Sequence, residues 1–443
     1  MLRTLLRTTT IAGAMALAGV AAAQEGPYAP FAGTTLVVNF PAHPHYNAVM
    51  EVLPEFTAQT GIEVEVDMLP FLDMRERQTL ELALDEGSYD LISYVVFSKA
   101  DYVFADQIRN LAPFFMNPRL ADPSYDPEDL IDGYVQNIGV AGGERGYLPG
   151  PTGSLYGLPF GSETSVLYYR TDIFEEHGLT PPETYDELLD LACRIPELEP
   201  GMGGVASRAA SGHHASHAWL LHLAPLGGRV FDETWNPILN NEAGVAAAEA
   251  LRQIVECGPA GSSAFGPAEA ANAFAQGQAA MFLDSIAYAA DFQDPARSTV
   301  VGNVGYAMHP MGVRRGSQTG GFGLAIPRNA EHPEAAFLLM QWLTSREGDL
   351  AVAMAGGNPS RFSTYANAEL NARYPWSAAF GEALEFADPD WRPIIPAWGR
   401  INADIGTTMS QVLTEGLDIQ TALDGIADRT RALMEEEGYY IWQ

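Results

Sequence analysis

The chain has 443 residues, of which 47% are hydrophobic and 10% aromatic, so it can build the cores of two or three globular domains. It carries 56 acidic residues against 24 lysines and arginines, which gives a formal net charge of -32, and Lys99 is its single lysine. So acidic a surface repels polyphosphates, which argues against binding to nucleic acid or to anionic lipid headgroups. Schiff-base and P-loop sites each need a lysine, and a chain with a single lysine is a poor candidate for either. The composition indicates a soluble, acidic, multi-domain protein that is not a nucleotide enzyme.

The amino terminus has the pattern of an export signal. Arg3 and Arg7 precede an uncharged apolar run that ends in three alanines before Gln24. The run is too short to span a bilayer comfortably, no cysteine stands at the cleavage point, and no later segment approaches the length of about 20 apolar residues that a transmembrane helix needs. We therefore expect residues 1–23 to be removed near Ala23 and Gln24, which takes the formal charge from -32 to -34. The mature protein is expected in the periplasm.

The first part of the chain alternates strand and helix patterns. Short apolar or alternating runs predict strands, longer amphipathic runs predict helices, and a glycine directly after a helix marks its end. The predicted elements are a strand at Thr35–Phe40, a helix at Tyr46–Thr60 closed by Gly61, a strand at Ile62–Asp67, a helix at Asp73–Leu84 and a strand at Asp90–Phe97. This order predicts a largely parallel α/β sheet.

A stretch rich in glycine and proline, Gly146–Gly157, then leads into a strand at Ser165–Tyr169 and predicts a crossing between lobes. Thr184 as N-cap with Glu187 in the capping-box position predicts a helix start. Further predicted elements are helices at Tyr185–Ile195, around Trp219, at Gly244–Cys257, Ala268–Gln276 and Pro333–Thr344, the last of them amphipathic, and a Gly-rich strand at Gly320–Pro327. The remainder is mostly helical.

Two cysteines, Cys193 and Cys257, lie near the ends of predicted helices. In an exported protein a disulfide between them can persist, but sequence spacing does not show that they meet. A bridge and two buried free thiols both stay open.

Catalytic and metal-binding motifs are scarce. The chain lacks the G-x-S-x-G, H-E-x-x-H and C-x-x-C patterns. His213 and His217, with His214 between them, would share one face of a helix and could hold a divalent metal, but no third ligand stands nearby. A polar wall or helix start is the simpler interpretation of this group, and no cofactor is expected.

Recognition-type residues follow the predicted strands of the first part. Asn39 and His43 come after the first strand, and Tyr94 stands at the end of the third. In open α/β sheets, ligands bind beyond the carboxyl ends of the strands. Aromatic faces, carboxylates and amides suit a hydroxylated ligand.

Several segments, in order along the chain, also resemble a known family. They are Leu155–Pro159, Leu167–Phe174 and Gly178–Glu187, the F-x-x-G-x-A-A-M run Phe274–Met281, the Gly-rich segment Gly320–Ile326 with Pro333–Phe337 after it, and the turn Gly356–Arg361. Together they resemble family 1 extracellular solute-binding proteins of ABC importers, with the closest likeness to the sugar- and polyol-binding, maltose-binding-protein-like subgroup.

The resemblance implies an α/β protein with the two-lobe periplasmic-binding-protein fold of type II. The ligand cleft would lie between lobes joined by crossing strands, and the lobes would close on the ligand by a hinge motion. After the signal, residues 24–160 plus 324–355 would form lobe 1, and 161–323 plus 356–443 would form lobe 2.

The resemblance also implies site residues. The expected ligand contacts are Glu163 as the acidic sugar contact, Tyr94 as a rim aromatic, Arg208, Asp284, the backbone at Gly320 and Gly321, and Arg361 on the opposite wall. Asn39 and His43 are added because they follow a predicted strand. Trp398 is added as a residue that could stack on a sugar ring. The region after Met281 lacks the tryptophan that maltose-type members use for stacking, which favours a small sugar or polyol.

We therefore expect an exported, monomeric binding protein, not an enzyme. It would capture a small carbohydrate or polyol by lobe closure and deliver it to an ABC permease in the inner membrane. One alternative keeps the fold but binds an organic anion or a metal ion through Arg208, Arg361 and the histidine group. A remote alternative is a secreted glycoside-acting enzyme that uses two carboxylates.

Overall fold

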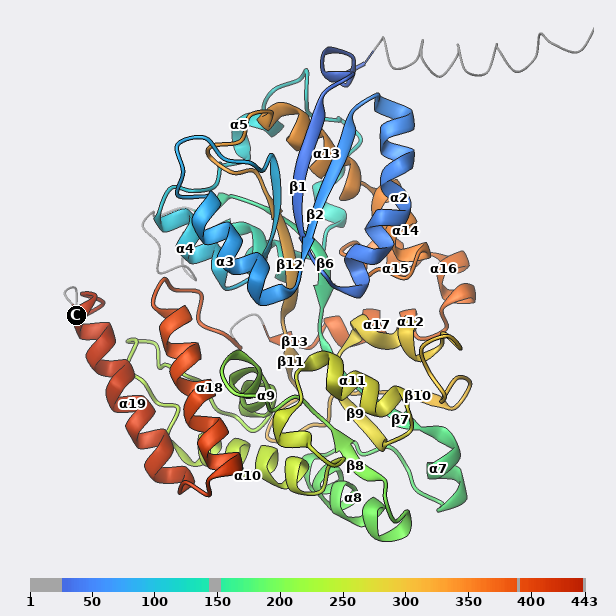
Figure 1. Cartoon of the computed structure of the whole chain (residues 1–443), viewed down its shortest axis with the longest axis vertical. Helices are drawn as coiled ribbons and strands as arrows, with labels where there is room; N and C mark the ends of the chain where they lie inside the picture. The colour runs from blue at the N-terminus through green and yellow to red at the C-terminus, as the bar shows by residue number, and fades with distance from the viewer. Residues whose placement is uncertain (1–25, 143–152, 389–390, 441–443) are drawn as a thin grey trace, which may run out of the picture.

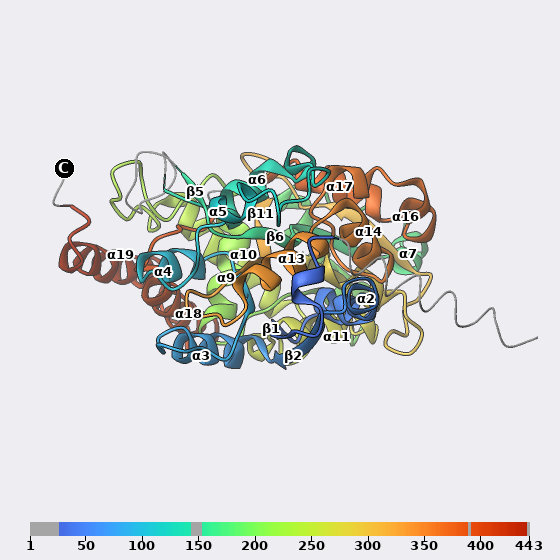
Figure 2. The same ribbon diagram turned by 90° about the horizontal axis from the view of Figure 1, so that it is seen from above.

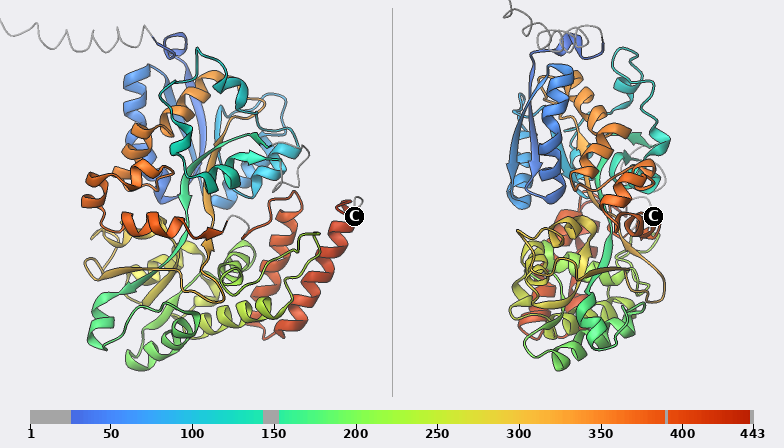
Figure 3. Two further views of the ribbon diagram at one scale, coloured as in Figure 1. Left: turned by 180° about the vertical axis from the view of Figure 1, so that it is seen from behind. Right: turned by 90° about the vertical axis from the view of Figure 1, so that its right-hand side faces the viewer.

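The computed structural model describes residues 26–142, 153–388 and 391–440. The export signal expected over residues 1–23 lies outside the described residues, as does much of the Gly- and Pro-rich stretch at 146–157. The described chain folds into two lobes stacked along the long axis, each built around its own sheet (Figures 1 and 3). This confirms the two-lobe α/β architecture.

The first lobe contains a five-stranded sheet of order β2-β1-β3-β12-β6. Its strands are β1 (Thr35–Pro41), β2 (Glu63–Leu69), β3 (Leu91–Val95), β6 (Leu158–Glu163) and β12 (Gly320–Ala325). The predicted parallel pairing holds for β1 with β2 and β3, but β12 runs antiparallel to both of its neighbours. The chain enters β12 from the second lobe, so this strand begins at the edge where β1, β3 and β6 end. That edge faces the second lobe.

Local signals explain the helices of this lobe. Helix α2 (Pro44–Thr60) begins at His43, whose ring accepts a hydrogen bond from the backbone of His45, and ends at Gly61, which adopts φ 73°. Only glycine takes such a left-handed conformation freely. Helix α13 (Pro333–Leu343) differs from its predicted amphipathic form, because it is buried on nearly every side. Helices cover both faces of the sheet, with α3 (Phe71–Glu81) and α13 on opposite sides (Figure 2).

The single lysine lies inside this lobe. Lys99, in α4 (Ser98–Phe104), is 2% exposed. Its ammonium donates to the backbone carbonyls of Asn137, at 2.6 Å, and Val140 at the end of a π-helical turn. Burial lowers the pKa of Lys99 to about 7.

The second lobe contains a four-stranded sheet of order β10-β7-β9-β8. Its strands are β7 (Ser165–Arg170), β8 (Gly203–Ala206), β9 (Ala279–Ser285) and β10 (Val304–Met308). Helix α8 (Tyr185–Leu198) begins with the predicted capping box, in which Thr184 and Glu187 bond each other's backbone amides. A disulfide joins Cys193 of α8 to Cys257, which follows α10 (Glu242–Glu256), and this settles the alternative that the sequence left open.

The remaining elements complete the two lobes and the region between them (Figure 1). The helices are α5 (Ala112–Phe115), α6 (Asp132–Tyr134), α7 (Thr171–Glu176), α9 (His213–Leu223), α11 (Pro267–Ala275), α12 (Ala289–Phe292), α14 (Arg346–Met354), α15 (Phe362–Tyr365), α16 (Ala368–Arg373), α17 (Ser377–Leu384), α18 (Trp398–Thr414) and α19 (Ile419–Glu436), and the short strands are β4 (Val140–Ala141), β5 (Ser154–Leu155), β11 (Ser317–Gln318) and β13 (Ala387–Asp388). None of the helices within the described ranges is long and apolar enough to cross a bilayer.

Two strand connections cross between the lobes, and the chain passes to the second lobe once more between α14 and α17 (Figure 3, left). One runs from β6 through Thr164 into β7, and the other runs from β10 through β11 into β12. The Thr164 and Ser317 hydroxyls hydrogen-bond at 2.5 Å, so the two crossings are tied to each other. The lobe boundaries expected at 24–160 plus 324–355 and at 161–323 plus 356–443 stay a prediction.

Candidate binding cleft

A cavity of about 640 Å³ lies where the edges of the two lobes meet. This volume is in the range of about 300–1,000 Å³ that small-molecule sites occupy. First-lobe residues at the ends of β1 and β3 line it, together with the end of β6 and the start of β12. From the second lobe come residues after β8 and β9 and residues of α9 and α11. The wall residues used below are His43, Phe71, Val95, Glu163, Arg208, His213, His214, His217, Ser285, Tyr288, Gln318, Gly320, Gly321, Phe322 and Arg392.

Glu163 is the last residue of β6 and stands at the crossing itself. One carboxylate oxygen lies 3.1 Å from Nε2 of His43, and the other accepts a hydrogen bond of 2.6 Å from the hydroxyl of Ser285. Burial raises the pKa of Glu163, but the charge and hydrogen bond of His43, the Ser285 hydroxyl and the charge of Arg208 outweigh burial, so the pKa lies below its usual value. Glu163 is therefore ionised, and its partners come from both lobes.

Arg208 and Asp284 form a buried ion pair on the second-lobe wall. Arg208 follows β8, and its Nε donates to Asp284 in β9 at 2.7 Å while Nη2 bonds the second carboxylate oxygen. Asp284 is fully buried and also accepts from the backbone amide of Ser285 at 2.7 Å. Arg208 lines the cavity, whereas Asp284 lies behind it and orients the guanidinium. Bidentate pairing of this kind fixes the direction of the remaining N–H groups.

Gly320 and Gly321 bring bare backbone to the cavity wall at the start of β12. Gly321 adopts φ +96°, and a Cβ there would lie 2.2 Å from the carbonyl oxygen of Gly161. Any larger residue at position 321 would therefore displace the crossing strand β6.

The histidine group stands in the first turns of α9. His217 bonds Arg392 through Nδ1 at 2.6 Å, and Nδ1 of His213 lies 3.2 Å from the amide nitrogen of Asn402. The ring of His213 packs against Phe71, at 5.6 Å between centroids. Burial, together with nearby arginines, lowers the pKa of both His213 and His217. These rings therefore act as neutral parts of the wall, each held by a different protein partner.

Three residues expected at the site lie elsewhere. Tyr94 is fully buried, and its hydroxyl donates to the Ile138 carbonyl at 2.6 Å; its neighbour Val95 lines the cavity instead, because adjacent strand residues point to opposite faces. The amide oxygen of Asn39 accepts from Gln78 at 2.8 Å, inside the first lobe. Trp398 begins α18 and has no exposed surface, so it offers no stacking face.

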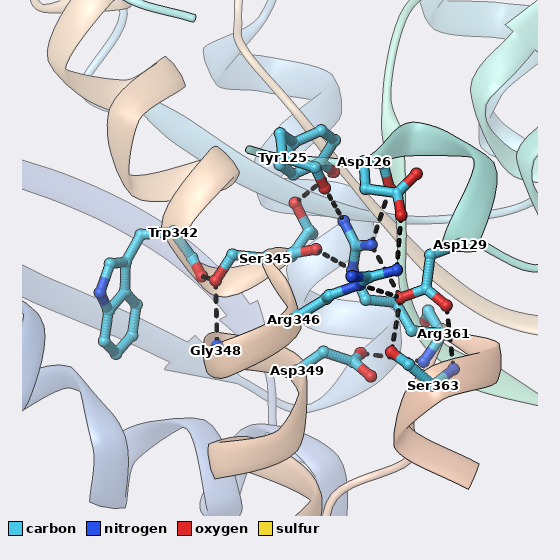
Figure 4. A network of polar contacts seen from close by, with 12 residues as sticks. Tyr125, Asp126, Asp129, Trp342, Ser345, Arg346, Gly348, Asp349, Arg361 and Ser363 are labelled. Atoms are coloured by element: carbon cyan, nitrogen blue, oxygen red, sulfur yellow. Dashed lines mark hydrogen bonds and ion pairs between the residues drawn. The ribbon is translucent and has the colours of Figure 1, made fainter. Parts of the chain in front are cut away.

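Arg361 also stands away from the cavity, at the centre of a polar network in the first lobe (Figure 4). Its guanidinium donates to the backbone carbonyls of Thr344, Asp126 and Tyr125 at 2.7–2.9 Å and pairs with the Asp129 carboxylate at 3.1 Å. It has no exposed surface. All three guanidinium nitrogens donate to protein acceptors, so Arg361 fastens the loop that carries Asp126 and Asp129 to α13 and α15, and does not form the opposite wall.

Asp349 of α14 lies in the same network (Figure 4). One carboxylate oxygen accepts from the Ser360 amide at 2.9 Å, and the other has no partner among the described residues. Burial outweighs these hydrogen bonds and raises the pKa of Asp349 from 3.8 to about 6. The fold therefore prefers the protonated acid, and the stability it contributes is complete below the unfolded pKa and is lost as pH rises through about 6.

We expect Asp349→Asn to raise the free energy of unfolding by about 1–2 kcal/mol at pH 8, because a neutral amide replaces a buried carboxylate, and to change it little at pH 4. Urea denaturation at the two pH values measures the difference. Asp428→Asn, at an exposed position of α19, controls for the loss of one negative charge. Equal destabilisation by Asp349→Asn at both pH values would contradict the assignment.

Arg392 is one of the wall residues that sequence reasoning missed. It follows Trp391 in a proline-rich break between β13 and α18, where no strand end or helix face marks a site. The signal that could have found it is the scarcity of cations: with 24 lysines and arginines in 443 residues, an arginine flanked by tryptophan and proline is a candidate beside Arg208. Ser285 and Tyr288 were missed for a similar reason, because they follow β9 without any distinctive motif.

Known proteins are similar to this chain in sequence and in fold. The family of bacterial extracellular solute-binding proteins matches residues 42–349. The mannitol-binding protein of Pseudomonas aeruginosa is 27% identical over 83% of this chain and 85% of its own length, and the erythritol/L-threitol-binding protein of Mycolicibacterium smegmatis is 26% identical over 75% and 72%. A solute-binding protein of Agrobacterium radiobacter, solved in complex with ribitol, is 24% identical and superposes with a TM-score of 0.82 over 90% of this chain and 99% of its own. The two lobes, the crossing segments and the match over most of the chain together show that this protein belongs to the bacterial extracellular solute-binding protein family.

Proposed function

We propose that this solute-binding protein captures a small polyol or sugar between its lobes and hands it to the membrane permease of an ABC transporter. The observation that carries this proposal is the cavity at the meeting edge of the two sheets, with Glu163 held ionised at the crossing by His43 of one lobe and Ser285 of the other. A ligand there touches both lobes at once, so its binding favours the closed arrangement.

The chemistry of the wall suits a hydroxylated ligand. Glu163 supplies acceptors, Arg208 supplies donors, and the backbone at Gly320 and Gly321 allows close approach. The wall has no broad tryptophan face, since Trp391 and Trp398 are buried. The aromatic residues of the described wall are Phe71, Tyr288, Phe292 and Phe322, and none is a tryptophan. Broad tryptophan faces bind the rings of oligosaccharides, so a wall without one favours a short open-chain polyol. The names of the mannitol-binding and erythritol/L-threitol-binding relatives support the same class.

The proposal includes export and transport. The charge and alanine pattern of residues 1–23 supports cleavage near Ala23 and export to the periplasm, where a monomer would meet its permease. The lobes are proposed to move about the Thr164 and Ser317 crossings. Glu163 and Arg208 are proposed to hold ligand hydroxyls, and no bond of the ligand is broken.

A thermal-unfolding panel tests the ligand class. Sugars, polyols, organic acids and divalent ions are added one at a time, and a ligand at about 100 times its dissociation constant raises stability by about 2.7 kcal/mol. We expect a stabilising shift with at least one polyol or sugar. A panel in which no compound bearing several hydroxyls raises the unfolding temperature, while a divalent ion does, would overturn the proposal; release of a chromophore from a glycoside would favour the enzyme instead.

Glu163→Ala should weaken binding of the ligand found in that panel by about 2–4 kcal/mol, because the hydroxyls it accepts from would stay buried and unpaired. Glu163→Gln, which keeps an acceptor for the Ser285 hydroxyl, should lose less binding affinity than Glu163→Ala. Isothermal titration calorimetry measures both affinities. If Glu163→Ala binds as tightly as the unaltered protein, Glu163 is not a ligand contact.

A further inference from the structure

Arg392 is a buried cation on the cavity wall. Its side chain is 5% exposed, and its guanidinium carbon lies 4.0 Å from the ring centre of Trp391 and 5.2 Å from that of Phe97. Trp391 precedes it in the chain, whereas Phe97 follows β3 of the first lobe. Contacts with two aromatic rings hold the planar group in place before any ligand arrives.

The hydrogen bonds of Arg392 leave donors unused. Nη2 donates to Nδ1 of His217 at 2.6 Å. Since that nitrogen accepts, the proton of the neutral imidazole sits on Nε2. In the part of the chain that the structure describes, neither Nε2 of His217 nor Nε of Arg392 has a hydrogen-bond partner, although both are buried. Arg392 and His217 both line the cavity, and each keeps one donor that no described residue uses.

Arg392 also lacks a direct ion pair among the described residues. Asp284 is paired with Arg208, and the cavity-lining Asp291 is paired with Arg297. Among the described residues, no carboxylate forms an ion pair with Arg392 within 4 Å. Arg75 adds a second guanidinium 4.8 Å from the same Phe97 ring. Burial, and then the charges of Arg208 and Arg75, hold the pKa of Arg392 well below its usual value, and the more distant carboxylates of Glu163 and Asp284 offset this only in part.

A buried charge without a directly paired counter-charge is costly. The hydroxyls of a neutral polyol can accept hydrogen bonds from Arg392, but they cannot neutralise it. An anionic group can do both, and a planar oxyanion matches a planar guanidinium. The protein has a formal net charge of -32, so this buried positive charge does not belong to a generally basic surface. Glu163 would repel the anion, so the hydroxylated end of the ligand belongs beside Glu163 and the anionic end beside Arg392.

We propose that the ligand of this cleft is a polyhydroxylated chain with an anionic group at one end, a carboxylate or a phosphate ester, bound by Arg392 and His217. This proposal rests on the function proposed above, because it assumes that the cleft takes a hydroxylated chain. It narrows the ligand class from neutral polyols to their acids or phosphates.

Calorimetry with three probes that share one carbon chain tests it: D-mannitol, D-mannonate and D-mannitol 1-phosphate, at neutral pH. We expect at least one of the two anions to bind at least about tenfold more tightly than mannitol. The anion that binds more tightly shows whether the negative group is a carboxylate or a phosphate ester. Tighter binding of mannitol than of either anion would overturn the inference and leave the proposed function standing. Failure of all three probes and of the whole earlier panel would overturn the proposed function instead.

Substitutions then test the residue. Arg392→Gln should bring the ratio of anion to mannitol affinities close to one, and Arg392→Lys, which keeps the charge but not the planar fork, should retain part of it. Arg429→Gln, an exposed arginine of α19, removes the same charge far from the wall and should leave the ratio unchanged. A ratio that survives in Arg392→Gln would show that another group binds the anion. Unfolding temperatures of the free proteins confirm that each variant is folded.

Discussion

Arg361→Ala should lower the free energy of unfolding by about 3–5 kcal/mol, because it breaks a buried ion pair and strips three backbone carbonyls of their donor. The guanidinium is fully buried, and Asp129, its carboxylate partner, would keep only the exposed Arg346 and the donors of Ser363. Urea denaturation measures the loss. Arg361→Lys should recover only part of it, since one ammonium cannot reach all the acceptors that the fork reaches.

Ligand affinity distinguishes this structural role of Arg361 from the ligand-binding role that the sequence suggested. A wall residue would lose binding on substitution, whereas Arg361 should leave the affinity of the folded protein unchanged. Arg373→Ala, at an exposed position of α16, serves as the matched control and should stay within about 0.5 kcal/mol of the unaltered protein. Lost binding with unaltered stability in Arg361→Ala would return Arg361 to the ligand site.

Arg208→Ala should have an effect of similar size on stability, about 3–5 kcal/mol, since Asp284 would remain as an unpaired carboxylate with no exposed surface. It should also weaken ligand binding, because Arg208 lines the cavity. Asp284→Ala should cost about as much stability, because it strands the guanidinium instead.

The paired change decides whether the two residues act as a unit. Arg208→Met with Asp284→Leu removes both charges together, and its loss of stability should be well below the sum of the two single losses. Chemical denaturation of the unaltered protein, the two single variants and the double variant gives the coupling energy. We expect calorimetry to show that ligand binding is still impaired in the double variant. Additive losses would mean that the pair contributes no coupling.

Much of the fold could be predicted because its signals are local. The glycine that ends α2 and the capping box of Thr184 and Glu187 act within a few residues, and both are seen where the sequence indicated. The direction of β12 could not be predicted, because it depends on the chain returning from the other lobe. The burial of α13 was missed for the same reason: its polar residues meet protein, as Gln341 does with the Leu120 carbonyl at 3.1 Å.

The residues of the candidate site could likewise be predicted only in part. The resemblance indicated Glu163 and Arg208, and the structure places both on the cavity wall beside His43 and the two glycines. It could not say which way a side chain points at a strand end, so Tyr94 was expected where Val95 stands. It also could not tell a structural arginine from a cavity arginine. Arg361 and Arg392 differ in whether protein acceptors use their donors, and only three-dimensional contacts decide that.

The buried position of Lys99 has a practical consequence for coupling chemistry. Amine-reactive dyes and surface-immobilisation reagents attack unprotonated amines that solvent can reach. Lys99 is the single lysine of the chain, it is 2% exposed, and its ammonium is held by backbone carbonyls. In the folded protein the chain therefore offers such reagents no accessible lysine, so coupling a fluorescent reporter or a sensor surface through a lysine side chain requires an engineered residue.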